Sequence, residues 1–201
     1  MASDAFTNTD GTALSTHNAN WGQLGGYVLA DLTIVSNQVR IAAWGESGAR
    51  YTASSIDLSQ AVQEAVSEVN HHTHVCVRAS ASVKGYHFKL LEISGGNWTT
   101  LTAYKDGAWL GATTVSISAG VTHTLKITAS GTSTVTIKCY VDNTEYLSLT
   151  DSATPLGTGN PGFILDGESI EAKADDWTDG AAGGGGAAAV FMHHQNMMAG
   201  N

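Results

Sequence analysis

Hydrophobic and polar residues alternate most clearly between Val75 and Ile93. In the runs 75–79 and 86–90 every second residue is apolar, and the polar turn Ser82-Val83-Lys84-Gly85 separates the two runs. Because a period of two places successive side chains on opposite faces of a strand, this pattern predicts a β-hairpin with one buried face. The opposite face carries the remaining side chains, Cys76, Arg78, His87 and Lys89.

The same alternation recurs along most of the chain, at the short spacing of an all-β sandwich. We expect further strands at 27–34, 38–44, 49–54, 98–104, 109–117, 123–129, 134–141, 146–149, 163–165 and 169–177. Turn signals separate several of them, namely Ser36-Asn37, Asp106-Gly107 and Asp142-Asn143. Loop 150–162 holds both prolines of the chain, which suits a connection between sheets. We therefore predict two packed antiparallel sheets.

Segment 56–69, IDLSQAVQEAVSEV, fits two periodicities. Leu58, Val62 and Ala65 lie near a helical stripe, but alternation also describes the segment. Expected strands flank it on both sides and it has no clear capping box, so we interpret it as a strand.

The composition agrees with a strand-and-turn protein. The 201 residues are 42% hydrophobic and only 13% charged, and they include 23 glycines. Nine basic residues stand against eighteen acidic ones, a net charge of −9 that would repel a phosphate backbone. We therefore exclude nucleic acid as a ligand class. No run of residues predicts an export signal or a membrane span.

Both cysteines, Cys76 and Cys139, lie within strand-like alternation. This position favours buried thiols that behave as small hydrophobic groups over a disulfide, whose formation depends on whether the two strands adjoin.

The order of several short motifs resembles a known family. The motifs are Phe6-x-x-x-Asp10-Gly11 with Trp21, the strand Val75–Ala79, Gly85-Tyr-His-Phe88, Trp98-x-x-Leu101, His123-Thr-Leu125, Val141-Asp-Asn143, Asp151, Gly159-Asn-Pro-Gly162 and Asp175-Asp-Trp177. Over residues 4–178 they resemble the concanavalin A-like lectin/glucanase superfamily, in particular its laminin-G-like jelly-roll modules. The resemblance implies an all-β, two-sheet antiparallel jelly-roll β-sandwich, followed here by a Gly-rich C-terminal tail.

The superfamily includes sugar-binding modules, glycan hydrolases and virion surface proteins, so the fold does not decide the function. Hydrolases that resemble laminarinases carry a Glu-x-Asp-x-x-Glu cluster on one strand, and this sequence has none. Glycoside hydrolysis needs two carboxylates. The nearest pairs, Glu64 with Glu68 and Glu168 with Glu171, do not have that spacing, and Glu92 stands alone. We therefore predict no catalytic residues.

Candidate glycan ligands lie on the polar strand faces. Aromatic rings stack on sugar rings, and positioned polar groups read the hydroxyls. The candidates are Arg78, His87, Lys89, Tyr104, Trp109 and Tyr140. Ordinary surface side chains are the competing interpretation.

Two groups of residues are candidate metal sites. The run His71-His72-Thr73-His74 contains potential transition-metal ligands, but no further ligands are marked by spacing, so we interpret it as a solvated strand entrance. Modules of this superfamily often hold a structural calcium between an N-terminal loop and the last strand. The resemblance implies that Asp10, Asp175 and Asp176 are candidate ligands of this calcium. The alternative is that they are solvated acidic side chains without a metal.

The chain is expected to divide into a jelly-roll domain at 1–178, a Gly-rich linker at 179–186 and an apolar, Met-rich anchor at 187–201. Exposed apolar side chains in the anchor would form an uncovered patch, and methionines adapt to irregular grooves. We therefore predict that the tail binds another protein subunit through Val190, Phe191, Met192, Met197 and Met198.

These observations favour a non-catalytic jelly-roll module displayed on a larger assembly. The expected assembly is a virion, such as a bacteriophage particle, where the module would decorate the capsid or tail surface and bind cell-surface glycans. A free carbohydrate-binding protein and a glycan hydrolase are the alternatives.

Overall fold

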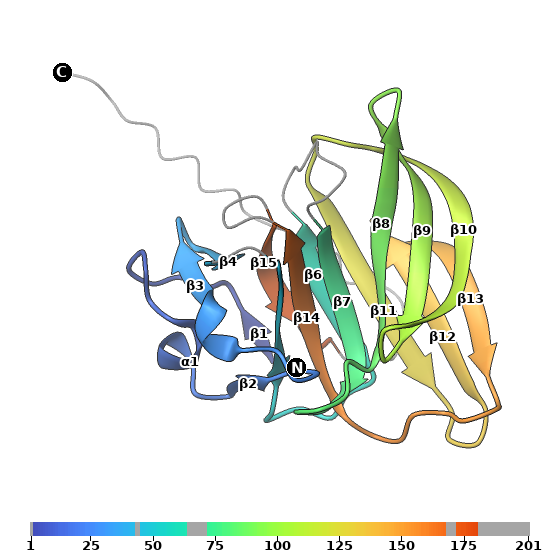
Figure 1. Cartoon of the computed structure of the whole chain (residues 1–201), viewed down its shortest axis with the longest axis horizontal. Coiled ribbons are helices and arrows are strands. Elements are labelled where there is room, and N and C mark those ends of the chain that lie inside the picture. Colours follow the sequence, from blue (N-terminus) through green and yellow to red (C-terminus); the bar gives the residue numbers. More distant parts are fainter. Residues whose placement is uncertain (1, 43–44, 64–71, 168–171, 181–201) are drawn as a thin grey trace.

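A computed structural model of the chain describes residues 2–42, 45–63, 72–167 and 172–180. These residues form two antiparallel sheets packed face to face (Figure 1). Sheet A consists of β13 (Thr144–Asp151), β12 (Val135–Val141), β11 (His123–Ser130), β6 (Leu58–Gln63), β15 (Lys173–Thr178), β4 (Gln38–Ile41) and β3 (Leu32–Val35), with β1 (Ser3–Asp4) beside β15. Sheet B consists of β10 (Ala108–Ser118), β9 (Asn97–Lys105), β8 (Tyr86–Ser94), β7 (His72–Ala79), β14 (Asn160–Gly167), β5 (Gly45–Tyr51) and β2 (Trp21–Gln23).

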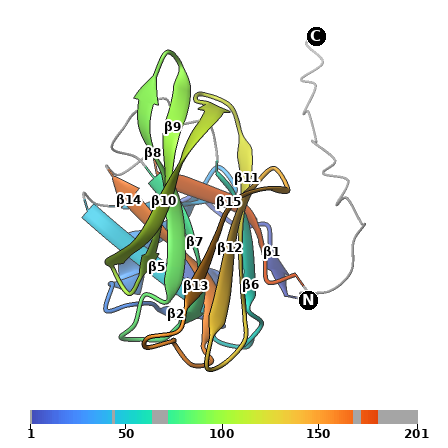
Figure 2. The same ribbon diagram turned by 90° about the vertical axis from the view of Figure 1, so that its right-hand side faces the viewer.

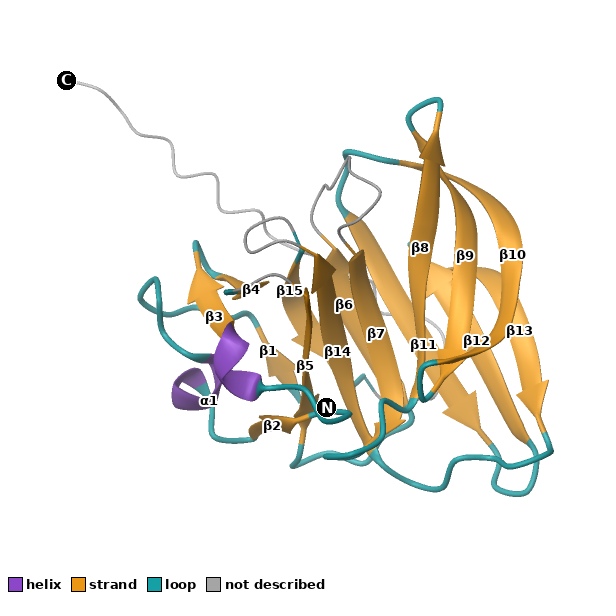
Figure 3. Ribbon diagram, viewed as in Figure 1, coloured by secondary structure: helices purple, strands orange, loops and turns teal. Residues whose placement is uncertain are grey.

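Helical structure in the described residues is limited to the four-residue helix α1 (Leu14–His17) and the 3-10 turn η1 (Leu29–Asp31) (Figure 3). The predicted all-β sandwich is therefore confirmed. Within the described part of the chain no helix is long and apolar enough to cross a bilayer. The strand expected at 27–34 begins only at Leu32, because the 3-10 turn precedes it.

The predicted central hairpin is confirmed as β7 and β8, in which Val75 lies opposite Phe88 and Val77 lies opposite Tyr86. Two-residue hairpin turns of the primed type need positive φ at both positions. All three predicted turns have it, with φ of 53° and 59° at Ser36-Asn37, 48° and 83° at Asp106-Gly107, and 49° and 64° at Asp142-Asn143. Local turn chemistry therefore sets the register of these hairpins.

Segment 56–69 was interpreted as a strand, and its first half forms β6 between β11 and β15. Residues 64–69 lie outside the described ranges. The segment between β13 and β14 connects sheet A to sheet B, as predicted. It holds only Pro155, because Pro161 lies in β14, at the register shift between Asn160 and Gly162. Figure 2 shows the strands β8, β9 and β10 facing β11, β12 and β13 in the two layers.

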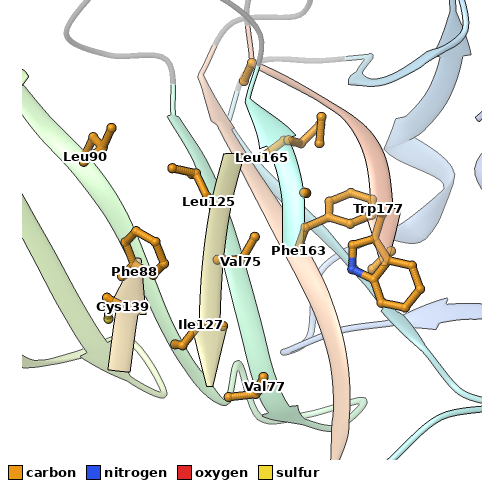
Figure 4. Packing of buried hydrophobic residues seen from close by; sticks show 14 of the residues in the cluster. Val75, Val77, Phe88, Leu90, Leu125, Ile127, Cys139, Phe163, Leu165 and Trp177 are labelled. Atoms are coloured by element: carbon orange, nitrogen blue, oxygen red, sulfur yellow. The ribbon is translucent and has the colours of Figure 1, made fainter. Parts of the chain in front are cut away.

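The core lies between the sheets and is built from the apolar side of the alternation (Figure 4). Buried apolar side chains of β7, β8 and β14 face those of β11, β12 and β15. Figure 4 labels Val75, Val77, Phe88, Leu90, Leu125, Ile127, Cys139, Phe163, Leu165 and Trp177 among them. Each large aliphatic or aromatic side chain buried in this way contributes about 1.5–3 kcal/mol to the stability of the fold. Both cysteines are buried and unpaired, as their alternation predicted.

Candidate functional site

A hollow of about 120 Å³ opens on the face of sheet B that points away from the core. Its lining comes from four strands and two turns that are far apart in the sequence. The lining residues are Glu46 of β5, His74 of β7, Lys84 of the β7–β8 turn, His87 and Lys89 of β8, Tyr104 of β9 and Gly107 of the β9–β10 turn.

Aromatic rings form a row across the strands beside this hollow. The rings of His74 and His87 stack with centroids 5.4 Å apart and an interplanar angle of 17°. The rings of His87 and Tyr104 continue the stack at 5.3 Å and 14°. Trp109 lies directly opposite Tyr104 in the β9–β10 pair, and its side chain is 68% exposed. The row therefore runs from a buried imidazole to an exposed indole.

The charged groups of the hollow are paired with one another. Lys84 Nζ lies 3.0 Å from the Glu46 carboxylate and 4.5 Å from the centroid of the Tyr27 ring. The Tyr27 hydroxyl also donates to Glu46. Lys89 Nζ lies 2.7 Å from Asp166, which is the cross-strand neighbour of Glu46. Two ammonium groups thus face two carboxylates.

Hydrogen bonding controls the ionisation of Glu46. Burial acts to raise the pKa of this carboxyl, but the hydrogen bonds from Tyr27 and Lys84 outweigh burial, so its pKa is lowered. Glu46 is therefore a carboxylate at neutral pH.

Both imidazoles of the hollow are neutral at pH 7. His74 is 2% exposed, and neither of its ring nitrogens has a hydrogen-bond partner among the described residues. Burial, followed by repulsion from the protonated form of His87 and from Lys89, holds the pKa of His74 well below its usual value. Burial also lowers the pKa of His87 to about 4.

The interpretation of the histidine run as a solvated strand entrance is wrong for the two histidines that the structure describes. His72 and His74 are only 5% and 2% exposed. His72 packs against Trp98 with ring centroids 5.7 Å apart, and His74 packs against His87. The outward face of sheet B is buried at these two positions. Alternation therefore assigned the two side chains to the correct face but did not predict their burial. His71 lies outside the described residues.

Arg78 does not lie with the other glycan candidates, contrary to the alternation. β7 carries an extra residue opposite β14, because Ala79 pairs with Asn160 while Cys76 pairs with Gly162. Arg78 adopts a positive φ of 56° in this bulge. Its guanidinium then reaches Asp57 at 2.6 Å and the carbonyl of Gly131 at 2.7 Å. Both partners belong to sheet A or its loops, so Arg78 joins the two sheets.

Tyr140 also lies away from the hollow, on β12 of sheet A, where Lys126 Nζ is 4.3 Å from its ring centroid. Of the predicted candidates, the structure brings together His87, Lys89 and Tyr104 and places Trp109 beside them. The sequence reasoning missed Glu46, His74 and Lys84 as members of the same site. The histidine run contained one of the three, but no spacing linked it to Glu46.

The described residues contain no group of three or more His, Cys, Asp or Glu side chains that could hold a metal ion. The three calcium candidates therefore do not form such a group. Asp10 instead accepts a hydrogen bond from the Ser36 amide at 2.7 Å, and Asp175 and Asp176 lie on β15. Glu64, Glu68, Glu168, Glu171 and the five apolar residues of the predicted anchor lie outside the described residues.

No protein-family model and no curated protein sequence matches the chain. Solved structures do resemble it. A carbohydrate-binding module, CBM66 from Bacillus subtilis, is 15% identical with a TM-score of 0.55, over 78% of this chain and 91% of that one. The carbohydrate recognition domain of Emp46p is 12% identical with a TM-score of 0.53, over 89% and 95%. A β-glucanase from Bacillus licheniformis is 13% identical with a TM-score of 0.52, over 88% and 95%.

These likenesses show the fold, which is the concanavalin A-like jelly roll that the sequence motifs resemble. Proteins with this fold in the comparison include both carbohydrate-binding modules and glucanases.

Proposed function

We propose that this concanavalin A-like jelly roll is a non-catalytic glycan-binding module, and that the hollow on sheet B with its row of rings is the binding site. The observation that carries the proposal is the row itself, in which His74, His87 and Tyr104 stack and Trp109 stands exposed at the end. Ring faces pack on the C–H faces of sugars, while a few converging polar groups read hydroxyls. Similar solved structures include carbohydrate-binding modules, which supports the same ligand class.

The state of the two carboxylates at the hollow favours binding over hydrolysis at this site. A glycosidase needs one carboxylic acid that is protonated at working pH, so the pKa of that group must be raised. Glu46 and Asp166 are cross-strand neighbours on this face, but each is paired with a lysine, and the pKa of Glu46 is lowered. Glycan hydrolysis is the alternative function, because glucanases share the fold.

The test is isothermal titration calorimetry of the full chain with soluble oligosaccharides, comparing Tyr104→Ala with Tyr140→Ala. Both substitutions remove a partly buried tyrosine from the outer face of a sheet, but only Tyr104 lines the hollow. We expect Tyr104→Ala to weaken binding about tenfold, which corresponds to about 1.4 kcal/mol, and Tyr140→Ala to leave it unchanged. Equal effects of the two substitutions would place the site elsewhere. Release of reducing ends from the same oligosaccharides would instead support the hydrolase.

We also propose that the module is displayed on a larger assembly, specifically a virion. Residues 187–201 would anchor the module to the particle. The proposal rests on the sequence of the tail, in which a Gly-rich linker precedes an apolar, Met-rich segment. Removal of residues 181–201 is expected to abolish co-sedimentation with the particle and to leave glycan binding intact. Normal assembly of the truncated chain would contradict it.

A further inference from the structure

We infer that the hollow selects an uncharged sugar ring, which the neutral imidazoles of His74 and His87 recognise, and that it discriminates against acidic sugars. The inference rests on the proposed glycan-binding function and specifies its ligand class. Four features of the hollow carry it: an unpartnered buried imidazole, the tautomer of the second imidazole, the balance of charge and the size of the space.

His74 is the first feature. Polar groups that are buried as deeply as this side chain almost always have hydrogen-bond partners. Both ring nitrogens of His74 have none among the described residues, although the side chain lines an open hollow. A neutral imidazole offers one donor and one acceptor. A sugar hydroxyl, which both donates and accepts, satisfies either nitrogen, whereas a carboxylate or a sulfate can only accept.

The tautomer of His87 gives the same preference. Its Nδ1 lies 3.3 Å from the carbonyl oxygen of Gly85. Because a carbonyl oxygen only accepts, Nδ1 carries the proton, and in a neutral ring Nε2 is then an acceptor. Nε2 can therefore accept a hydrogen bond from a ligand group that donates. A hydroxyl supplies one, and an anionic substituent does not.

Charge balance removes the usual attraction for an acidic ligand. The two lysines that line the hollow are already paired with carboxylates, Lys84 with Glu46 and Lys89 with Asp166. The Glu46 carboxylate itself lines the hollow and would repel an anion. With both imidazoles neutral, the charged side chains sum to zero, so an uncharged ligand enters without leaving an unpaired charge behind.

The size of the hollow limits how much of a glycan it encloses. Pockets for drug-sized ligands measure about 300–1,000 Å³, whereas this hollow measures about 120 Å³. We therefore assign a single sugar ring to the hollow and the next ring of the chain to the exposed Trp109, which lies directly opposite Tyr104.

Acid should release the sugar. Protonation of His87 or His74 turns an acceptor into a donor and adds a positive charge among the groups packed around them. The basic and aromatic groups are Lys84, Lys89 and Tyr104, with His72 near His74 on β7, and the remaining groups are Glu46, Tyr27 and Asp166. Since burial lowers the pKa of His87 to about 4, binding should persist at pH 6 and weaken as the pH approaches 4.

The experiment compares a neutral glucan oligosaccharide with its uronic acid counterpart and its sulfated derivative, by calorimetry on the full chain at pH 7 and pH 4. We expect the neutral sugar to bind at least tenfold more tightly than either acidic one, and to lose at least tenfold in affinity at pH 4. Far-ultraviolet circular dichroism at pH 4 verifies that the chain is still folded. Tighter binding of an acidic sugar would overturn this inference while leaving glycan binding intact. Absence of binding by all three sugars would overturn the proposed function itself.

Two variants test whether the imidazole of His74 itself recognises the sugar. His74→Leu removes the unpartnered polar atoms and is expected to retain the fold, with at least a tenfold loss of affinity for the neutral sugar. His74→Gln keeps a donor and an acceptor, so it should retain more of the affinity than His74→Leu. Equal affinity of His74→Leu and the unaltered chain would contradict the assignment. A glucan affinity of His74→Gln no better than that of His74→Leu would also contradict it.

Discussion

Replacing Arg78 by methionine tests whether this side chain holds the two sheets together or binds a ligand. Methionine keeps the length and the apolar stem but removes the guanidinium. The Arg78 side chain is 5% exposed, and it donates from Nε to both oxygens of Asp57 at 3.0 Å and from Nη1 to the carbonyl of Leu156 at 2.9 Å. Its Nη2 donates to Asp57 at 2.6 Å and to Gly131 at 2.7 Å.

The expected cost follows from what is left behind. Removing one partner of a buried, hydrogen-bonded ion pair typically costs about 3–5 kcal/mol, since the other charge stays buried without compensation. Asp57 is 24% exposed, so water can partly solvate its carboxylate. We therefore expect the lower end, about 3 kcal/mol. With a urea m-value of about 2 kcal/mol/M, the unfolding midpoint should fall by about 1.5 M.

Urea denaturation followed by tryptophan fluorescence measures this shift, and two comparisons interpret it. Lys138→Met removes the cation of an exposed ion pair, Lys138 with Glu145, and should leave the midpoint unchanged. The double variant Arg78→Met/Asp57→Leu should recover part of the loss, because no unpaired carboxylate remains. A midpoint shift for Arg78→Met as small as that for Lys138→Met would refute the reasoning, and lost glycan binding in a fully stable Arg78→Met would restore its predicted role as a ligand.

Three further predictions concern stability and reactivity. Gly85→Ala should destabilise the fold by about 3 kcal/mol or more, because φ is +77° and the added Cβ would lie 2.2 Å from the carbonyl oxygen of Val77. The control Gly26→Ala has a similar φ of +84° but no atom within 4 Å of the added Cβ, so it should cost only about 1–2 kcal/mol. Thermal unfolding of the two variants measures the difference. His87 binds a proton at higher pH when unfolded than when folded, so the free energy of unfolding should fall by about 3 kcal/mol as the pH drops from about 6.5 to about 4. Denaturation curves at the two pH values measure this loss, and His87→Gln should reduce it. Burial raises the pKa of both cysteine thiols, so a thiol reagent at pH 8 should titrate neither cysteine in the native chain and both in urea; rapid native labelling would contradict the packing.

The central hairpin and the turns show what could be predicted locally. Alternation predicted β7 and β8, and the dipeptides Ser36-Asn37, Asp106-Gly107 and Asp142-Asn143 predicted turns with positive φ. These features depend on neighbouring residues only, because strand periodicity and turn conformation are properties of a few consecutive side chains. Motif order added the jelly roll, which the solved structures bear out at the level of the fold.

The candidate site could be predicted only in part. His87, Lys89 and Tyr104 were expected on polar strand faces, and the structure brings them together because β8 and β9 are adjacent strands in which His87 lies opposite Tyr104. Arg78 was misplaced because one extra residue in β7 reverses the direction of a side chain, and the sequence carries no mark of that bulge. The histidines of β7 were expected in solvent because alternation assigns a face to a side chain but does not say what covers it.

The sequence by itself thus determined the strands, the hairpin turns, the apolar faces and the class of fold. The tertiary structure alone decided that β14 lies between β7 and β5, which brings Glu46 and Asp166 beside Lys84, Lys89 and the two imidazoles. The physical reason is distance along the chain: pairing of strands separated by about a hundred residues depends on the packing of the whole core and on loop closure, and a local pattern cannot encode it.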